Sequence, residues 1–339
     1  MTRKRSGTAM KDEPRLMPNA PTTKQRAGKV HPVIIFPYTF PNPEKDRGVG
    51  LENLKALYSF LSTLLGDPRF ARPITVMNRQ TFYTNTRWVY DDRLHDSFEN
   101  IISKEVEAHS TIVHTWAVDT CQMWLAGFGK AYDEDNPADD VYWLIPGDFN
   151  YAKDRHEEQK NRMVFRMRQL PEAVLDHDQD LAIGEITVDI NSAKQLIDTY
   201  GTYGLLYNWF PHEAQAIRRI TDKPRSEFLA ISHGFLREVL RQRWYAYEQT
   251  IIILLQATIG KKRVHPIKLG DLSDLPQGRE KLSAAMQQVE RTERALKLFW
   301  RERNESQSDW ADRFKRLDAQ SGQIRGAALV ILENLLVYP

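Results

Sequence analysis

Short apolar runs alternate with helix-like stretches through the first half of the chain, and this alternation constrains the fold more than any other feature. Strands are expected where β-branched and aromatic residues cluster between turn residues, and helices where apolar residues recur every three or four positions. The predicted strands are residues 31–41, 71–80, 111–117 and 141–148, and the predicted helices are residues 48–66, 97–110 and 118–135. Such alternation is typical of a parallel sheet covered by crossover helices.

The second half of the chain continues the alternation and then becomes helical. Its predicted elements are a charged helix at 155–170, a strand at 180–188, a helix that begins at Asn191, a strand at 205–211, a strand or turn that leads into a helix at 225–243, an apolar helix or strand at 245–258, and helices at 279–317 and 324–337. We therefore expect an α/β fold with a mostly parallel sheet, flanking helices and a helical C-terminal extension. The expected divisions are a tail at 1–29, an α/β domain at 30–275 and the extension at 276–339.

Charge and cysteine content argue against several classes of protein. The 339 residues carry a formal net charge of +2, which gives no support to a nucleic-acid partner. The single cysteine, Cys121, excludes an internal disulfide and a cysteine-rich zinc site, and it favours a cytoplasmic location. No apolar run approaches the roughly 18 residues of a membrane span. The composition is that of a globular protein with a substantial core.

The first 29 residues differ from the rest of the chain. They contain eight lysines and arginines and almost no large apolar side chains. A segment of this composition is expected to be a disordered, solvated tail. The alternative is an electrostatic tether to an anionic surface, which includes peripheral contact with a membrane.

A carboxylate follows the predicted strand at 141–148. In the stretch VYWLIPGDFNY, Asp148 and Asn150 come two residues apart directly after the apolar run. In extended backbone, residues two apart point to the same side, and ligands of parallel sheets bind beyond the carboxyl ends of the strands. Carboxylate and amide oxygens suit Mg²⁺ or Mn²⁺, which can clamp a diphosphate. The alternative is an ordinary turn in which Asp148 bonds its own backbone.

Three further segments carry candidate binding residues. Lys45 and Arg47 precede a predicted helix, where cationic groups and the helix N-terminus both favour phosphate, and Tyr38 lies nearby to stack on a base. Further along, Arg225 with Ser226, and Arg243 with Glu248, suit an anionic donor and an acceptor. The alternatives are an ordinary exposed loop and a capped helix with solvated charges.

His265 is the candidate for a third metal ligand. It lies in the stretch GKKRVHPIKLGDL, and a neutral imidazole can complete a metal site with Asp148. A lone histidine is otherwise a structural residue. The signatures of serine hydrolases and zinc hydrolases are missing from the sequence.

The order of these features resembles nucleotide-sugar glycosyltransferases of the GT-A fold, of the mannosylglycerate/glucosylglycerate synthase or polyprenyl-phosphate glycosyltransferase type. VIIFPYTF is similar to the base-binding strand and turn of that family, which assigns Pro37 and Tyr38 to the donor. The segment that ends in IPGD looks like the helix and strand before an Asp-x-Asp motif. RSEFLAI and RWYAYEQTIIILLQA look like the acceptor-side strand and helix, and His265 falls where some members place a metal ligand.

This resemblance implies transfer of a sugar from a nucleotide-diphosphate sugar to a small-molecule or lipid-phosphate acceptor, with Mg²⁺ or Mn²⁺. Asp119 or Glu248 would position or deprotonate the acceptor hydroxyl, and Arg225 would stabilise the leaving diphosphate. The sequence departs from the family where Asn150 replaces the second aspartate and where the base-binding loop carries EKDRG.

Two alternatives stay open at this point. The first is a sugar nucleotidyltransferase, which should have a glycine-rich loop after its first strand, whereas this loop has only Gly48 and Gly50. The second is a degenerate transferase or scaffold without activity. In that reading the helical C-terminus, with Trp300 and Trp310, forms a homo-oligomer interface.

Overall fold

The fold is described from a computed structural model. The described residues are 28–36, 55–59, 61–62, 66–78, 82–84, 87–89, 107–115, 120–147, 149, 151, 157–187, 193–245, 248–271 and 281–337.

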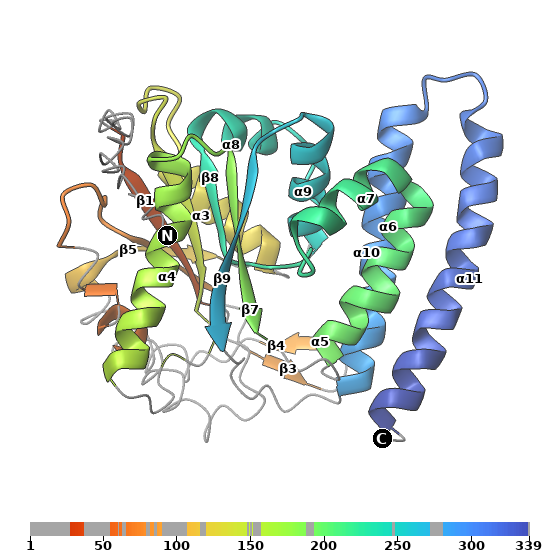
Figure 1. Cartoon of the computed structure of the whole chain (residues 1–339), viewed down its shortest axis with the longest axis horizontal. Helices are drawn as coiled ribbons and strands as arrows, with labels where there is room; N and C mark the ends of the chain where they lie inside the picture. Colours follow the sequence, from red (N-terminus) through yellow and green to blue (C-terminus); the bar gives the residue numbers. More distant parts are fainter. Residues whose placement is uncertain are drawn as a thin grey trace, which may run out of the picture.

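One mixed sheet forms the centre of the molecule (Figure 1). Its strands are β1 (Val30–Phe36), β2 (Ile74–Asn78), β5 (Thr111–Thr115), β6 (Val141–Pro146), β7 (Leu181–Thr187), β8 (Leu229–Ser232) and β9 (Val264–Asp271). They are arranged in the order β5-β2-β1-β6-β8-β7-β9. All neighbours pair in parallel except β8, which is antiparallel to both β6 and β7. A separate antiparallel pair is formed by β3 (Phe82–Thr84) and β4 (Arg87–Val89).

Helices cover both faces of this sheet and extend beyond one side of it (Figure 1). The named helices are α3 (Thr120–Ala131), α4 (Glu157–Leu175), α5 (Ala193–Leu196), the π-helical turn η1 (Ile197–Thr202), α6 (Tyr203–Trp209), α7 (Pro211–Ile220), α8 (His233–Leu240), α9 (Gln249–Ile259), α10 (Lys281–Asn304) and α11 (Trp310–Val337). The mostly parallel sheet, its flanking helices and the helical C-terminal region agree with the prediction.

Alternate residues of the central strands enter two apolar clusters. Val33 and Ile35 of β1 pack in the cluster that contains α3, whereas Ile34 packs in the cluster that contains Met163 and Met167 of α4. Successive side chains of a strand point to opposite faces, and a parallel sheet covered on both faces is apolar on both. This is why the continuous apolar runs of β1 and β6 were recognisable in the sequence.

Residues 205–209 belong to the helix α6 and Pro211 begins α7, so the strand predicted at 205–211 is wrong. Leu205, Leu206 and Trp209 are buried, whereas the Tyr207 side chain is 44% exposed. A strand would place residues 205, 207 and 209 on one face, but burial at positions one and four apart follows the helical period. With α5 and η1, α6 completes one helical run from Ala193 to Trp209.

The helices α10 and α11 share the larger apolar cluster with the sheet. Leu296 and Trp300 of α10 are buried, and the Trp300 ring lies 5.9 Å from the ring of Trp209 in α6. The Trp209 indole nitrogen donates to Ser321 Oγ of α11 over 3.1 Å. Trp300 therefore belongs to the interior of the molecule and is not available to an oligomer interface.

The strand β9 was not predicted. It forms an edge of the sheet and contains Pro266, which is tolerated at an edge because one side of such a strand needs no backbone donor. The segment also alternates apolar residues with His265 and Lys268, which weakens its resemblance to a buried strand. Among the helices of the described ranges, none is both long and apolar enough to cross a membrane.

Candidate functional site

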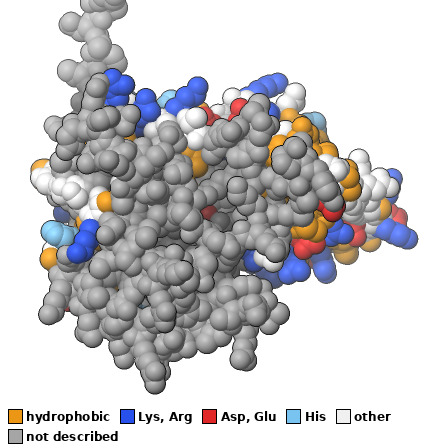
Figure 2. Space-filling model, turned by 90° about the horizontal axis from the view of Figure 1, so that it is seen from below, with side chains coloured by type: hydrophobic (Ala, Val, Ile, Leu, Met, Phe, Trp, Pro, Cys, Tyr) orange, Lys and Arg blue, Asp and Glu red, His pale blue; other side chains and the backbone are white. Residues whose placement is uncertain are grey.

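Parallel strands end together at one edge of the sheet, which lies at the bottom of Figure 1. Ligands of α/β proteins bind beyond this carboxyl-terminal edge. The antiparallel strand β8 begins at the same edge, so the residues before it meet the residues that follow β7. Figure 2 views the molecule from this side, and basic, acidic and hydrophobic side chains gather where α10 and α11 lie.

The end of β6 is anchored to its neighbours at this edge. The backbone nitrogen of Gly147 donates to the carbonyl oxygen of Ile35 over 2.6 Å, and the Tyr151 hydroxyl donates to the carbonyl oxygen of Pro146 over 2.8 Å. Phe149 is buried, and its ring lies 4.8 Å from that of Phe228. Asp148 and Asn150 lie outside the described residues, but the residues beside them are held at the carboxyl-terminal edge.

A buried polar cluster lies at the same edge, and we call it the Arg225 cluster: Arg225, Asp198, Glu248, Gln288 and Thr292. Arg225 Nε donates to Asp198 Oδ1 over 2.6 Å, and its Nη1 donates to Gln288 Oε1 over 2.5 Å. Thr292, one helical turn beyond Gln288, contacts Glu248 Oε2 at 3.2 Å. Four segments meet here: η1, the loop before β8, the start of α9, and α10.

Burial raises the pKa of Glu248 to about 7, and the charges of Arg225 and Arg291 and the hydrogen bond with Thr292 act in the opposite direction. The Thr292 hydroxyl also lies 2.9 Å from the carbonyl oxygen of Gln288. The Thr292 hydroxyl donates to Glu248 Oε2, and this carbonyl oxygen is a second acceptor within its reach.

Asp198 lies in the π-helical turn η1, which widens the helix between α5 and α6. Such turns are rare and occur often at functional sites. Gly201 of the same turn packs closely on α10, because a Cβ there would lie 2.7 Å from Val289 Cγ2. The close approach of η1 to α10 is what allows Asp198 and Gln288 to contact the same guanidinium group.

Ser226 supports the backbone beside Arg225. Its hydroxyl donates to the carbonyl oxygen of Gly184 over 2.5 Å and accepts from the Phe228 backbone nitrogen at 3.3 Å. The bond to Gly184 joins the loop before β8 to β7. Nearby, Thr221 Oγ1 donates to Glu185 Oε1 over 2.6 Å. The structure therefore brings together the predicted residues Arg225, Ser226 and Glu248.

His265 lies at the other end of the parallel strands, where they begin. It pairs in register with Ala182, near the start of β7. Because β6, β7 and β9 all point the same way, the first residues of β9 lie where β6 begins, and Gly147 lies where β6 ends. The structure does not bring His265 to the segment that carries Asp148.

The other predicted site residues lie outside the described residues. These are Pro37, Tyr38, Lys45 and Arg47 of the donor site and Asp119 of the catalytic pair. Within the described ranges, no three histidine, cysteine, aspartate or glutamate side chains are grouped to hold a metal ion. The metal donors still proposed are the oxygens of Asp148 and Asn150, and hard oxygen ligands are what Mg²⁺ and Mn²⁺ prefer.

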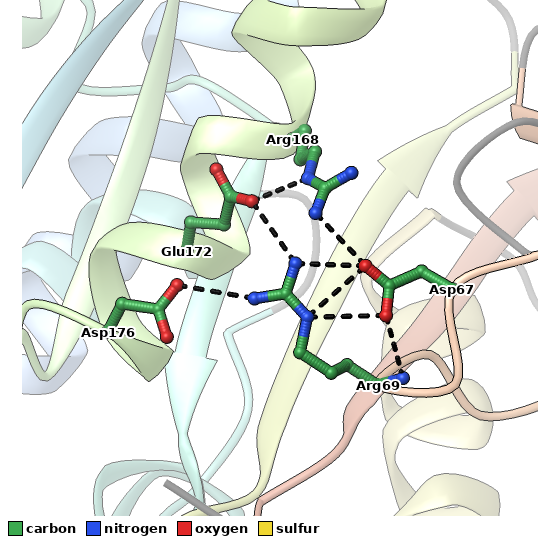
Figure 3. A network of polar contacts seen from close by, with 5 residues as sticks. All are labelled: Asp67, Arg69, Arg168, Glu172 and Asp176. Carbon is green, nitrogen blue, oxygen red and sulfur yellow. Dashed lines mark hydrogen bonds and ion pairs between the residues drawn. The ribbon is translucent and has the colours of Figure 1, made fainter. Parts of the chain in front are cut away.

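A second polar network lies away from the carboxyl-terminal edge and is structural (Figure 3). Arg69 and Arg168 both contact Asp67, at 2.9 Å and 3.0 Å, and Arg168 Nε donates to Glu172 Oε1 over 2.5 Å. Arg69 Nη1 also lies 3.5 Å from Asp176 Oδ2. The network ties α4 to the loop that precedes the bridge between Val30 and Phe70, at the start of β1.

Sequence reasoning missed three residues of the Arg225 cluster: Asp198, Gln288 and Thr292. Gln288 and Thr292 occupy positions four apart in α10, where they read as one polar stripe of a charged helix. Asp198 carried no signal beyond an acidic residue in a helical pattern. Their partners are 27 to 63 residues distant along the chain, so only the tertiary fold reveals the cluster.

No protein-family model matches the sequence, and no curated protein sequence matches it. Solved structures of glucosyl-3-phosphoglycerate synthase from Mycobacterium tuberculosis are similar in fold. One has a TM-score of 0.51 and 12% identity and covers 80% of both chains. Its complex with Mn²⁺, uridine diphosphate and glucosyl-3-phosphoglycerate has a TM-score of 0.51 and 12% identity over 78% of both chains. A complex with Mn²⁺, UDP-glucose and glycerol 3-phosphate has a TM-score of 0.51 and 13% identity over 78% of this chain and 79% of that one. At this level of identity the likeness establishes the fold, and the chain has the GT-A-like architecture predicted from its sequence.

Proposed function

We propose that the protein is a glycosyltransferase that moves a sugar from a nucleotide-diphosphate sugar to a small acceptor, assisted by a divalent metal ion. The observation that carries this proposal is the GT-A-like sheet, shared with enzymes whose structures hold Mn²⁺, uridine diphosphate and a glucosylated product. In this chain a carboxylate, Asp148, follows the central strand β6 of that sheet. Fold alone does not assign chemistry, so the residues at the edge carry the rest of the argument.

The donor is assigned to the carboxyl ends of β1 and β6. Asp148 and Asn150 are the proposed metal ligands, and His265 is left out because it lies at the other edge of the sheet. A bound Mn²⁺ or Mg²⁺ supplies positive charge beside the diphosphate leaving group. Lys45 and Arg47 are proposed to contact the diphosphate, and the segment Pro37–Tyr38 to contact the base.

The Arg225 cluster is proposed to form the acceptor side of the site. Glu248 is fully buried, so we assign it a positioning role: it accepts from Thr292 of α10, whose neighbour Gln288 contacts Arg225 together with Asp198. Asp119 directly precedes α3 and is the remaining candidate for contact with the acceptor hydroxyl. A fixed guanidinium group suits an acceptor that carries a carboxylate or a phosphate.

Further aspects of the proposal rest on the sequence. A lipid phosphate is the second acceptor class, with peripheral membrane contact through the basic segment 1–29. The low cysteine content supports a cytoplasmic setting. Assembly as a homo-oligomer is also proposed, through a surface that does not include Trp300.

Nucleotide binding tests the donor assignment. Thermal unfolding is measured with uridine and guanosine diphosphates, each with and without MnCl₂, because a ligand that binds only the folded state raises the melting temperature. We expect a metal-dependent increase with one of them, and its loss in Asp148→Ala. The matched control is Asp135→Ala, in the loop before β6 at the opposite edge, which should keep the increase. A full response in Asp148→Ala, or no response to either nucleotide, contradicts the assignment.

Turnover separates the transferase from its alternatives. UDP-glucose and GDP-mannose are offered with phosphoglycerate, glycerol 3-phosphate or a polyprenyl phosphate, and release of the nucleoside diphosphate is measured. A glycosyltransferase releases the diphosphate only with an acceptor. Release of pyrophosphate from a nucleoside triphosphate and a sugar phosphate would instead identify a sugar nucleotidyltransferase. Binding of nucleotide without any turnover would favour the non-catalytic reading that Asn150 suggests.

A further inference from the structure

A groove of about 630 Å³ lies between α4 and the edge strand β9. The two elements are neighbours, with α4 to the left of β9 in Figure 1. Its walls come from residues 162–177 of α4 and the turn after it, and from residues 265–268 of β9. This volume is in the range of pockets that hold small molecules.

Cationic side chains dominate the described lining of the groove. Arg162 and Arg166 come from successive turns of α4, and Lys268 comes from β9. His177 and His265 add ring nitrogens that can donate hydrogen bonds. Residues four apart on a helix lie on the same face, so both arginines are presented to β9.

Glu172 is the acidic residue of the described lining, and its carboxylate is paired with arginines that do not line the groove. Glu172 contacts Arg168 Nε at 2.5 Å and Arg69 Nη2 at 3.5 Å, and both belong to the network in Figure 3. Its carboxylate is therefore already matched by two guanidinium groups outside the lining. The described lining of the groove therefore holds more cationic than anionic side chains, which favours an anion.

Arg166 is held against the backbone of β9. Its Nη1 lies 3.5 Å from the carbonyl oxygen of Leu269, and a Cβ on Gly270 would lie 2.4 Å from the same nitrogen. Gly270 has a φ of +92°, a conformation that favours glycine. The strand thus leaves room for the guanidinium group, which is positioned before any ligand arrives.

Phe165 adds an aromatic surface to this basic groove. Its side chain is 61% exposed, although it is large and apolar. It lies beside Arg166 in sequence and one turn from Arg162, so its ring belongs to the same face of α4. An exposed ring among cations is a combination that binds a phosphate and a planar or sugar ring together.

We propose that this groove binds an organic phosphate, with the phosphate held by Arg162, Arg166 and Lys268 and the ring of the ligand on Phe165. The groove is distinct from the donor site, because β9 is the edge strand and is separated from β6 by β8 and β7. His265 belongs to this groove. The proposal does not depend on glycosyl transfer.

Adenosine monophosphate is the probe for the first experiment. Its affinity is measured by calorimetry at low salt in the presence of EDTA, which removes the divalent metal ion on which the proposed donor site depends. We expect binding that persists under these conditions and falls at least about tenfold in Arg162→Ala/Lys268→Ala, because two charge-assisted contacts are lost. Arg219→Ala, on the exposed side of α7, is the matched control and should bind normally.

A second variant tests the ring. Phe165→Ala should weaken binding of adenosine monophosphate several-fold while leaving the affinity for inorganic phosphate unchanged. These positions are at the surface, and an unchanged melting temperature checks that each variant folds. Two results would overturn the proposal: no binding of adenosine monophosphate under these conditions, or equal affinity in the groove variants and in Arg219→Ala.

Discussion

Arg225 donates from Nε to Asp198 Oδ1 over 2.6 Å, and this bond joins the loop before β8 to the π-helical turn after β7. Both side chains are largely buried, at 10% and 6% exposure. The pair fixes the relative positions of η1, the loop and α10 at the edge of the sheet where ligands are expected. Its loss should therefore affect stability as well as the geometry of the site.

We expect Asp198→Ala to lower the free energy of unfolding by about 3–5 kcal/mol, because it leaves Arg225 buried without its carboxylate. Urea denaturation measures the change. The matched control is Glu134→Ala, which breaks an exposed pair with Arg241 and should cost at most about 1 kcal/mol. Equal losses in the two variants would show that the buried pair does not hold these segments together.

Glu248 should make stability depend on pH between about 4.5 and 7. Its pKa is raised by burial to about 7 from 4.5, so in this range the folded state keeps a proton that the unfolded state releases. Its contribution is complete below pH 4.5 and is lost as the pH rises through 7. Urea denaturation at pH 5 and pH 8 should show that Glu248→Gln flattens this dependence. A difference between wild type and variant that is the same at both pH values would contradict the assignment.

Asp67 should act in the opposite direction at acid pH. Its hydrogen bonds with the Arg69 side chain lower its pKa from 3.8 to about 2, so its contribution is present above pH 3.8 and is lost as the pH falls toward 2. Urea denaturation between pH 3 and pH 6 should show Asp67→Asn less stable than wild type at pH 6, with the gap narrowing at pH 3. Glu134→Gln, at an exposed site, should show almost no gap at either pH. A gap for Asp67→Asn that does not change with pH would exclude this role.

Two glycines of α3 should respond oppositely to alanine. A Cβ on Gly127 would lie 2.4 Å from Val33 Cγ1 and 2.8 Å from Val76 Cγ2, whereas one on Gly129 meets nothing within 4 Å. Thermal unfolding should show Gly127→Ala destabilised by about 1–3 kcal/mol through overpacking. Gly129→Ala should gain up to about 1 kcal/mol from helix propensity. If both variants gain stability, α3 does not pack on β1 and β2 as closely as described.

The central strands were among the most readily predicted elements because they are buried on both faces of the sheet. The strands β1 and β6 carry apolar runs with turn residues after them. The helix α6 was misread because Leu205, Leu206, Trp209 and Phe210 form a short aromatic and aliphatic run, which suits either structure. Only packing against α11 decides in favour of the helix.

The candidate site was predictable in its residue types but not in its connections. Arg225 and Glu248 are charged residues beside apolar segments, which marked them as candidates. Their meeting with Asp198 and α10 depends on the reversed strand β8 and the π-helical turn, and neither has a sequence signature that we recognised. His265 was misplaced because the strand β9 was not predicted. This strand places His265 where the parallel strands begin, away from their carboxyl ends.

The shared core of sheet and C-terminal helices has a consequence for biosynthesis. Residues as late in the chain as Leu332 are fully buried, and they cover α6 and its neighbours. During translation the sheet strands emerge first, but the apolar surface that they and α6 present is not covered until α11 has been made. The nascent chain should therefore expose hydrophobic surface for most of its synthesis. Chaperones should remain bound to it until α11 has left the ribosome.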